Sequence, residues 1–480
     1  MTDGLADPLA WLVLLPLFWA VLAFIAGPGR GAGLALAGML AQTGWALHLA
    51  GTLLVGGPRE HAVGGWAAPL GIALAVDGLS ALMLLLVQAV ALLVLLYARG
   101  YYPRGSADGA YFWPLAGCLV GGMNALLVSA DLFNLYVGLE LIGLSAVSLV
   151  AASGDVQPLR AALRYLFATL LGSGAYLLGV ALIYASYGSV SLSTLTPLIE
   201  AQPPLSVQLA AALMLAGLLL KTALFPLHYW LPPAHGGAPA PVSALLSALV
   251  VKASFYLILR LGLGLYAPLM DAAAALLAVL GAGAILWGSW QAFRSIRLKM
   301  LIAYSTVAQL GYLFLIFPLL DRPDALQAGL LHTTAHALAK AGMFTAAGVV
   351  VKATGSDLIN GLSGAASRLP LTLFALALAG MTLMGLPPSA GFLAKWLLLG
   401  AAIDAGQWPL VLIILAGGLL AAVYVFRVLR QAFMPAQREG AIVHVSRRMQ
   451  WLAFVLAAAS VALGLRAVEF VQLLGVGWQQ

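Results

Sequence analysis

The sequence predicts an all-α, polytopic membrane protein that crosses the bilayer with fourteen transmembrane helices. Of its 480 residues, 63% are hydrophobic and only 8% are charged, whereas a soluble domain carries about 25% charged residues. Apolar runs of about 20 residues recur along the whole chain, and each is long enough to cross the hydrocarbon core as a helix. These runs are continuous rather than alternating, which excludes a transmembrane β-barrel.

The fourteen spans are separated by short connections rich in Gly, Pro or charge. No long linker interrupts them, so residues 1–480 are expected to form a single domain. The N-terminal run has acidic flanks and no small-residue cleavage site, which predicts a first membrane helix rather than a removed signal peptide. The predicted spans are 8–26, 32–55, 75–98, 110–128, 131–152, 161–186, 207–227, 239–262, 268–291, 299–319, 325–351, 370–387 continuing to 402, 408–430 and 449–474.

Lys and Arg are distributed unevenly among the predicted loops. With the N-terminus outside the cytoplasm, four fall outside: Arg59, Arg260, Arg322 and Arg466. Fifteen are counted with the cytoplasmic loops: Arg30, Arg99, Arg104, Arg160, Arg164, Arg294, Arg297, Lys299, Lys352, Arg368, Arg427, Arg430, Arg438, Arg447 and Arg448. This is the bias of the positive-inside rule, and a missed span would have scrambled it. We therefore expect a multi-pass protein of the cytoplasmic (inner) membrane with both termini outside the cytoplasm. The formal charge of +7 then reflects topology rather than a surface that binds nucleic acid.

Five ionisable residues are predicted to lie inside spans rather than at their ends. A charge in the middle of a membrane costs about 3 kcal/mol on insertion scales. Lysines can snorkel to an interface or form structural ion pairs, but four of them in separate helices beside a buried acid favour a proton relay. The five residues are Glu140, Lys221, Lys252, Lys340 and Lys395.

Glu140 and Lys221 suggest how such a relay would load a proton. Burial disfavours the charged form of a lysine, whereas a nearby carboxylate favours it. Movement of the acid toward or away from the lysine would therefore load and unload a proton. Asp131 is a secondary candidate, because it lies nine residues before Glu140, about 13 Å along the same helix axis.

A second cluster lies in the segment LHTTAHALAKAGMF. His332, His336 and Lys340 are spaced four residues apart, so they share one helix face. Histidine can carry protons near neutral pH. Metal binding and structural hydrogen bonding are the alternatives, but no carboxylate or cysteine lies nearby to complete a metal site. We expect a proton relay with no metal and no cofactor. His228 and His235 are secondary candidates, each equally compatible with a structural role.

Two spans are interrupted by prolines next to a lysine. The first reads LLLKTALFPLHYWLPP around Lys221, and the second reads GLPPSAGFLAKWL before Lys395. Proline removes a backbone hydrogen bond, which a membrane tolerates only where the open backbone is buried in protein or lines a wet cavity. Corresponding breaks in two halves predict two inverted five-helix repeats. These are helices 4–8 (about residues 110–262) and helices 9–13 (about 268–430), with broken helices 7 and 12.

Several segments resemble the antiporter-like subunits of respiratory complex I and of multisubunit (Mrp-type) Na⁺/H⁺ antiporters. The length and the motifs resemble the D-type subunit of the Mrp-type antiporter most. Lys395 is also similar to the exit lysine of one complex I subunit. The segments are DLFNLYVGLELIG (131–143), LLLKTALFPLHYWLPPAHGGAPAPVSALLSALVVKASFYLILR (218–260), LIAYSTVAQLGYLFL (301–315), HTTAHALAKAGMF (332–344) and GLPPSAGFLAKWLLL (385–399).

The resemblance implies a role for each buried charge. Glu140 and Lys221 would form an ion pair between helices 5 and 7. Lys252 would be the central connector on helix 8, and Lys395 the exit residue on helix 12. The helix 11 relay between them would consist of His332, His336 and Lys340.

The chain departs from the pattern of the family at two places. The usual LPDAH reads LPPAH here, with Pro233 where the aspartate is expected, which puts in doubt any contact that the aspartate makes. GDLFN reads ADLFN, with Ala130, which we expect to be a minor change. The long lateral C-terminal helix of one complex I subunit is also lacking, which argues against that paralogue.

Sequence and resemblance together predict a proton-translocating subunit of a multisubunit Na⁺/H⁺ antiporter. Its expected partners are other hydrophobic subunits, the lipid bilayer, protons and Na⁺, with no nucleic acid. The single cysteine, Cys118, excludes a disulfide framework and an iron–sulfur centre, so no redox centre of its own is expected. Three alternatives stay open: a subunit of a complex I-like NADH-quinone oxidoreductase or membrane-bound hydrogenase, a proton-coupling subunit of an inorganic carbon uptake complex, and a scaffold without transport.

Overall fold

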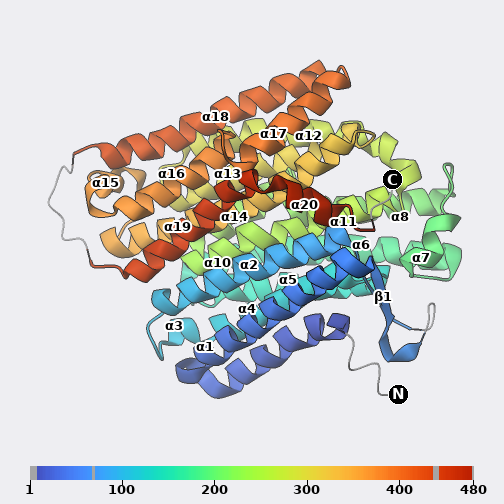
Figure 1. The fold of residues 1–480 in the computed structure, drawn as a ribbon, viewed down its shortest axis with the longest axis horizontal. Helices are drawn as coiled ribbons and strands as arrows, with labels where there is room; N and C mark the ends of the chain where they lie inside the picture. The colour runs from blue at the N-terminus through green and yellow to red at the C-terminus, as the bar shows by residue number, and fades with distance from the viewer. Residues whose placement is uncertain (1–7, 67–70, 436–442, 478–480) are drawn as a thin grey trace.

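The long helices run roughly along one direction, with the short helices α3 and α15 at one end and β1 and α7 at the other (Figure 1). The computed structural model describes residues 8–66, 71–435 and 443–477. Arg438, one of the basic residues predicted to be cytoplasmic, lies outside the described residues. Within the described ranges, eleven helices are long and apolar enough to span a membrane, and two further apolar helices are shorter. The all-α, polytopic prediction is confirmed, and the count of fourteen spans stays a prediction.

The first two predicted spans form one element, α1, which folds back on itself. Gly27 has a φ of 69° inside this element, and the side chain of Gln42 donates to the Leu12 carbonyl at 3.1 Å across the two arms. A short antiparallel sheet, in which Arg59 pairs with Val76, precedes the next span. The elements of the first half are α1 (Pro8–Gly56), β1 (Arg59–Ala62), η1 (Val63–Gly65), β2 (Ala73–Val76), α2 (Gly78–Tyr101), α3 (Ala107–Ala110), α4 (Phe112–Val128), α5 (Leu132–Ala151), α6 (Val156–Tyr187), α7 (Leu192–Leu195), η2 (Thr196–Leu198), α8 (Leu205–Thr222), η3 (Leu227–Trp230), α9 (Leu231–Gly237), α10 (Ala240–Leu245), η4 (Leu246–Val250) and α11 (Val251–Leu263).

The last predicted span is shorter than expected. The sequence predicts one helix over 449–474, but α19 ends at Ala462, and a separate helix, α20, packs against α2. The elements of the second half are α12 (Ala267–Arg294), α13 (Leu298–Phe314), η5 (Phe317–Leu319), α14 (Pro323–Thr354), η6 (Ile359–Leu362), α15 (Ala365–Arg368), α16 (Pro370–Met384), α17 (Ala390–Asp404), α18 (Trp408–Phe433), α19 (Arg447–Ala462), η7 (Leu463–Leu465) and α20 (Ala467–Leu474).

Both predicted helix breaks are present. α8 ends at Thr222, and the next residue, Ala223, takes the left-handed conformation with a φ of 58°. α16 ends before Gly385, which has a φ of 81°. The chain resumes at α17, whose first turn is capped by Ser389: its hydroxyl accepts from the Phe392 amide at 3.2 Å. Each break therefore separates two helical segments, and at the first break the second segment, α9, lies beyond residue 227, where the predicted span ends.

Helix packing recurs between the two halves of the chain. α4 packs on α5 and α6 on α8 in the first half, as α12 packs on α13 and α14 on α16 in the second. α11 also packs on α4, and α18 packs on α12. This recurrence is what a pair of five-helix repeats would produce. The repeat boundaries and their inverted relation stay predictions.

α14 and the α10–α11 segment form the interior of the bundle. The most apolar window of Pro323–Thr354 is 94% buried, and that of Ala240–Leu263 is 100% buried, against 33% for α1. α14 contacts α2, α10, α13, α16, α17 and α19. Polar side chains on α11 and α14 are therefore shielded from lipid by a shell of apolar helices.

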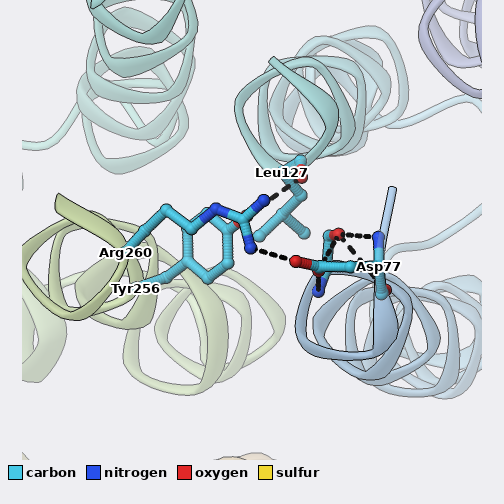
Figure 2. Close-up of polar contacts among 5 residues, drawn as sticks. Asp77, Leu127, Tyr256 and Arg260 are labelled. Carbon is cyan, nitrogen blue, oxygen red and sulfur yellow. Dashed lines mark hydrogen bonds and ion pairs between the residues drawn. The ribbon is translucent and has the colours of Figure 1, made fainter. Parts of the chain in front are cut away.

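An ion pair fastens α2 to α11 at the end of the bundle that carries β1 and α7 (Figure 2). Asp77 caps α2 by accepting from the amide of Ser80 at 3.0 Å, and its other carboxylate oxygen binds Arg260. Tyr256, one turn before Arg260, donates to the Leu127 carbonyl at 3.1 Å and so ties α11 to α4. Burial raises the pKa of the Asp77 carboxyl, but Arg260 and Ser80 outweigh it, so the pKa lies below its usual value. The pair is therefore charged at neutral pH.

The close approach of α6 and α8 generates the first testable prediction. A Cβ added at Gly217 would overlap the carbonyl oxygen of Gly172 on α6, whereas a Cβ added at Gly174 would meet nothing within 4 Å. Because backbone cannot move aside locally, Gly217→Ala should separate the two helices and cost about 1–3 kcal/mol. Thermal unfolding in detergent should show a lower midpoint for Gly217→Ala and an unchanged or higher one for the control Gly174→Ala. Equal midpoints for the two variants would show that this contact is not tight.

Candidate functional site

Eight ionisable side chains line the interior of the bundle from α5 to α17, and we call them the polar axis. Seven of them are buried, and Glu140 is partly buried. All seven primary candidates from the sequence belong to this set, and one secondary candidate joins them. The members of the polar axis are Glu140, Lys221, His235, Lys252, Lys340, His336, His332 and Lys395.

Lys221 is the penultimate residue of α8, and its side chain reaches α5 and α6. Its Nζ donates to Thr169 Oγ1 at 2.7 Å and to the Leu139 carbonyl at 3.4 Å. The same Nζ lies 3.8 Å from Glu140 Oε1, an oxygen without a hydrogen-bond partner among the described residues. The predicted pair is therefore present as a close charge contact, while Thr169 holds the lysine by a hydrogen bond.

A small cavity beside Lys221 extends the polar contacts toward α11. Its volume is about 20 Å³, and Tyr165, Thr169, Lys221 and Ser254 contribute to its lining. That volume is enough for one water molecule. The neighbouring Thr222 donates from its hydroxyl to Ser254 Oγ at 2.9 Å. Hydroxyl groups from α6, α8 and α11 therefore meet at the end of the first half-helix.

Lys252 and Lys340 are joined through α13. Lys252 donates to the carbonyl of Ser247, which lies in the π-helical turn η4, and the Ser247 hydroxyl lies 2.9 Å from that of Thr306. Lys340 donates to the Ile302 carbonyl at 3.0 Å, and the Thr306 hydroxyl donates to the same carbonyl at 3.1 Å. One serine, one threonine and one carbonyl thus link the two lysines. π-Turns inside helices are frequent at functional sites, and this one supplies the partner of Lys252.

The two histidines of α14 stack one turn apart. Their ring centroids are 5.8 Å apart with an interplanar angle of 22°. His332 Nε2 lies 3.2 Å from the Gln309 carbonyl. Neither ring nitrogen of His336 has a partner among the described residues, although Lys252 and Lys340 lie within electrostatic range of this ring. His336 thus has both nitrogens available for proton exchange in the middle of the axis.

Tyr312 of α13 bridges the histidines and Lys395. Its ring centroid lies 5.3 Å from that of His332, and Lys395 Nζ lies 4.4 Å from the same tyrosine centroid, a cation–π distance. Lys395 also donates to the Leu383 carbonyl at 2.6 Å. The axis therefore continues from α14 to the second break without leaving the protein interior.

The two breaks hold their freed carbonyls in different ways. At the second, Lys395 itself donates to the last carbonyls of α16, those of Leu383 and Met384. At the first, the Leu220 carbonyl accepts from the indole of Trp230 at 2.9 Å. Lys221 therefore does not donate to the carbonyls at the end of its own helix, and it binds α5 and α6 instead.

His235 is the secondary candidate that the structure brings into the axis. It lies on α9 with both ring nitrogens unpartnered among the described residues, and Lys252 and Lys340 lie within electrostatic range. Pro233, which replaces the expected aspartate, lies in the first turn of α9, where a missing N–H costs nothing. The replacement thus leaves the helix that carries His235 intact.

The other two secondary candidates lie elsewhere. His228 is half-buried on η3, with its ring centroid 5.6 Å from that of Phe225. Asp131 caps α5, because its carboxylate accepts from the Asn134 amide at 2.7 Å and from the Asn134 side chain. Its carboxylate is thus committed to a structural contact. Among the residues that the structure describes, no three His, Cys, Asp or Glu side chains gather as metal ligands.

Sequence reasoning missed the hydroxyl and aromatic members of this network, chiefly Thr169, Ser247, Thr306 and Tyr312. Spacing within LIAYSTVAQLGYLFL offered a signal, because Ser305, Gln309 and Tyr312 recur at helical intervals inside an apolar span. Sequence reasoning also counted Lys299 with the cytoplasmic basic residues, at the first residue of the predicted span 299–319, and did not expect it to be buried. The structure buries this lysine at the start of α13, where it binds the Ala238 carbonyl between α9 and α10.

Comparison with known proteins agrees with this geometry. Residues 129–421 match the family described as NADH:quinone oxidoreductase/Mrp antiporter, TM. The chain belongs to this family of proton-translocating membrane subunits. Residues 66–106 also match the N-terminal family described as NADH-Ubiquinone oxidoreductase (complex I), chain 5. The family resemblance inferred from the motifs is confirmed.

Relatives of both branches of the NADH:quinone oxidoreductase/Mrp antiporter family are similar over most of their length. The chain is 38% identical to the N-type subunit of the NADH-quinone oxidoreductase of Desulforudis audaxviator, covering 88% of this chain and 86% of the relative. It is 26% identical to the D-type subunit of the Na⁺/H⁺ antiporter of Bacillus subtilis, covering 85% and 80%. The fold matches a chain of the Mrp complex from Dietzia sp. with a TM-score of 0.91 at 27% identity, covering 99% and 97%.

The Lys221 contacts generate the second prediction. Thr169→Val keeps the side-chain shape but removes the hydroxyl that accepts from Lys221. Loss of a hydrogen bond to a charged group should lower the free energy of unfolding by about 1.5–3 kcal/mol, and the lysine should move onto Glu140. Unfolding in detergent and a cryo-EM structure of the variant would measure both effects. Thr169→Ser retains the hydroxyl and should resemble the parent; a valine variant with the parent's stability and lysine position would contradict the assignment.

Proposed function

We propose that this chain is the proton-translocating subunit of a multisubunit Na⁺/H⁺ antiporter. The observation that carries the proposal is the polar axis, a series of eight ionisable groups, seven of them buried, that lies with several hydroxyl groups in the interior from α5 to α17. Groups that exchange protons are placed in hydrocarbon only at a cost of several kcal/mol each. Eight such groups in one interior region, some of them linked by hydroxyls and carbonyls, support proton transfer more strongly than eight separate structural pairs.

Proton movement would proceed in three stages along the axis. In the first, the Glu140 carboxylate approaches or leaves Lys221, which Thr169 holds at 2.7 Å, so the lysine gains or loses a proton. In the second, the proton passes between Lys252 and Lys340 by way of the unpartnered imidazoles of His235 and His336. In the last, it crosses from the α14 histidines to Lys395, next to the freed carbonyls of α16.

Sodium would bind elsewhere in the complex. Na⁺ is a hard cation that needs several oxygen ligands, as Ca²⁺ and Mg²⁺ do, whereas the axis has four lysines and a single carboxylate, Glu140. Ammonium groups repel a second cation. The sodium pathway is therefore assigned to neighbouring hydrophobic subunits, with this chain supplying the proton side of the exchange.

A redox-driven complex is the second candidate function. It is favoured by the higher identity to the N-type subunit of NADH-quinone oxidoreductase, 38% against 26% for the D-type antiporter subunit. In that setting the same axis would be driven by electron transfer in other subunits rather than by sodium.

The third prediction tests whether Lys395 must release its proton or only needs to carry a positive charge. An arginine stays protonated at all working pH values, so Lys395→Arg retains the positive charge but removes the capacity to release a proton. Both Lys395→Arg and Lys395→Ala should lower proton flux through the intact complex in proteoliposomes by about 100-fold. The control Lys352→Arg, at the half-buried end of α14, should change it little. Full flux with Lys395→Arg would show that position 395 needs only a charge.

The fourth prediction separates the two candidate functions. An imposed Na⁺ gradient should change the pH inside inverted membrane vesicles that contain the intact complex. This change should occur without NADH or quinone. The Lys221→Ala variant serves as the matched control and should abolish the response. A response that requires an electron donor and is indifferent to Na⁺ would favour the redox-driven complex instead.

A further inference from the structure

A cavity of about 550 Å³ lies at the end of the bundle opposite β1 and α7. Three chain segments meet around it: the turn within α1, the end of α2, and the stretch from Ser106 to Trp113. Its volume falls in the range of small-ligand pockets, about 300–1,000 Å³. We propose that this cavity binds the headgroup of an anionic phospholipid.

Three arginines line the cavity, one from the turn in α1 and two from the end of α2 and the residues after it. Arg30, Arg99 and Arg104 are all exposed, and none forms an ion pair with a side chain that the structure describes. Four other arginines do form ion pairs with carboxylates in the described part of the chain, among them Arg260 with Asp77 and Arg297 with Asp357. Three arginines that line one cavity without a protein anion can bind an external anion, because guanidinium binds phosphate oxygens in a bidentate manner.

The cavity is also shaped for a phosphate at a lipid surface. Gly29 and Gly33 line it, and a Cβ added at either would meet nothing within 4 Å, so a headgroup can approach the backbone there. The mostly buried side chains of Trp113 and Tyr102 also contribute to the lining. Leu34, at the rim, is 40% exposed.

The outer face of α1 supplies the surface for acyl chains. Phe24 and Ile25, just before the turn, are 63% and 74% exposed. A soluble phosphate would use the arginines alone, whereas a phospholipid uses both the arginines and this apolar face. The distribution of Lys and Arg also predicts this end to be cytoplasmic, and basic pockets between membrane helices on that side bind anionic headgroups. The combination of features therefore favours a lipid over a free anion.

The test compares lipid selectivity in the intact complex. The probes are spin-labelled phosphatidylglycerol and phosphatidylcholine, with the relative association constant read by electron paramagnetic resonance. Replacing Arg30, Arg99 and Arg104 by Gln should reduce the preference for phosphatidylglycerol by about fivefold for each arginine removed. Replacing them by Lys should retain most of the preference, which separates loss of charge from loss of fold. The control changes Arg160→Gln and Arg164→Gln, on two exposed arginines of α6, should leave it unchanged.

Three results would overturn the proposal. The first is an equal loss of preference in the α6 control, which would reduce the effect to general surface charge. The second is displacement of the labelled lipid by soluble glycerophosphate at equal concentration, which would assign the cavity to a free anion. The third is selectivity in the isolated chain but not in the complex, which would show that a neighbouring subunit covers this surface.

Discussion

The arrangement of this protein depends on one constraint: a lysine in hydrocarbon must find an acceptor inside the protein. Each buried lysine of the polar axis does so, and in every case a backbone carbonyl takes part. Two of these carbonyls are available because the helix that carries them is irregular. Ser247 lies in a π-turn, and Leu383 lies where α16 ends. The irregular backbone and the buried charge are therefore two parts of the same structural solution, since either alone would leave an unsatisfied group in a medium that offers no water.

The same constraint couples neighbouring sites on the axis. Like charges repel strongly where the dielectric constant is low, and Lys252 lies within electrostatic range of both Lys340 and His336. A proton that arrives at one group therefore raises the cost of charging the next. Glu140 is the acid that faces Lys221, and its Oε1 accepts no hydrogen bond from the residues that the structure describes. The group best able to change the charge balance is thus one that the structure holds loosely.

Much of the fold follows from the sequence because membrane spans are set by apolar length, and the two breaks follow from proline chemistry. The ionisable residues of the axis could also be found, since each carries an evident cost in lipid. The π-turn η4 and the early end of α19 at Ala462 could not, because they depend on contacts between helices. Thr169 and Thr306 were missed for a related reason. A hydroxyl is inexpensive in a membrane helix, so its importance appears only when its partner from another helix is known.

The proposed role of the polar axis would account for the similarity of this chain to subunits of both oxidoreductases and antiporters. Nothing in the series from Glu140 to Lys395 requires an electron carrier or a sodium ligand, so the same groups can serve either kind of complex. The driving reaction must then act on the axis from its ends or from neighbouring subunits, through contacts that alter the position of Glu140 or of the broken helices. If the axis and the driving reaction lie in different subunits, this chain should resemble both the N-type oxidoreductase subunit and the D-type antiporter subunit, as it does. In the proposed mechanism, the groups that transfer protons lie inside the bundle, and the surfaces that meet other subunits would determine what drives them.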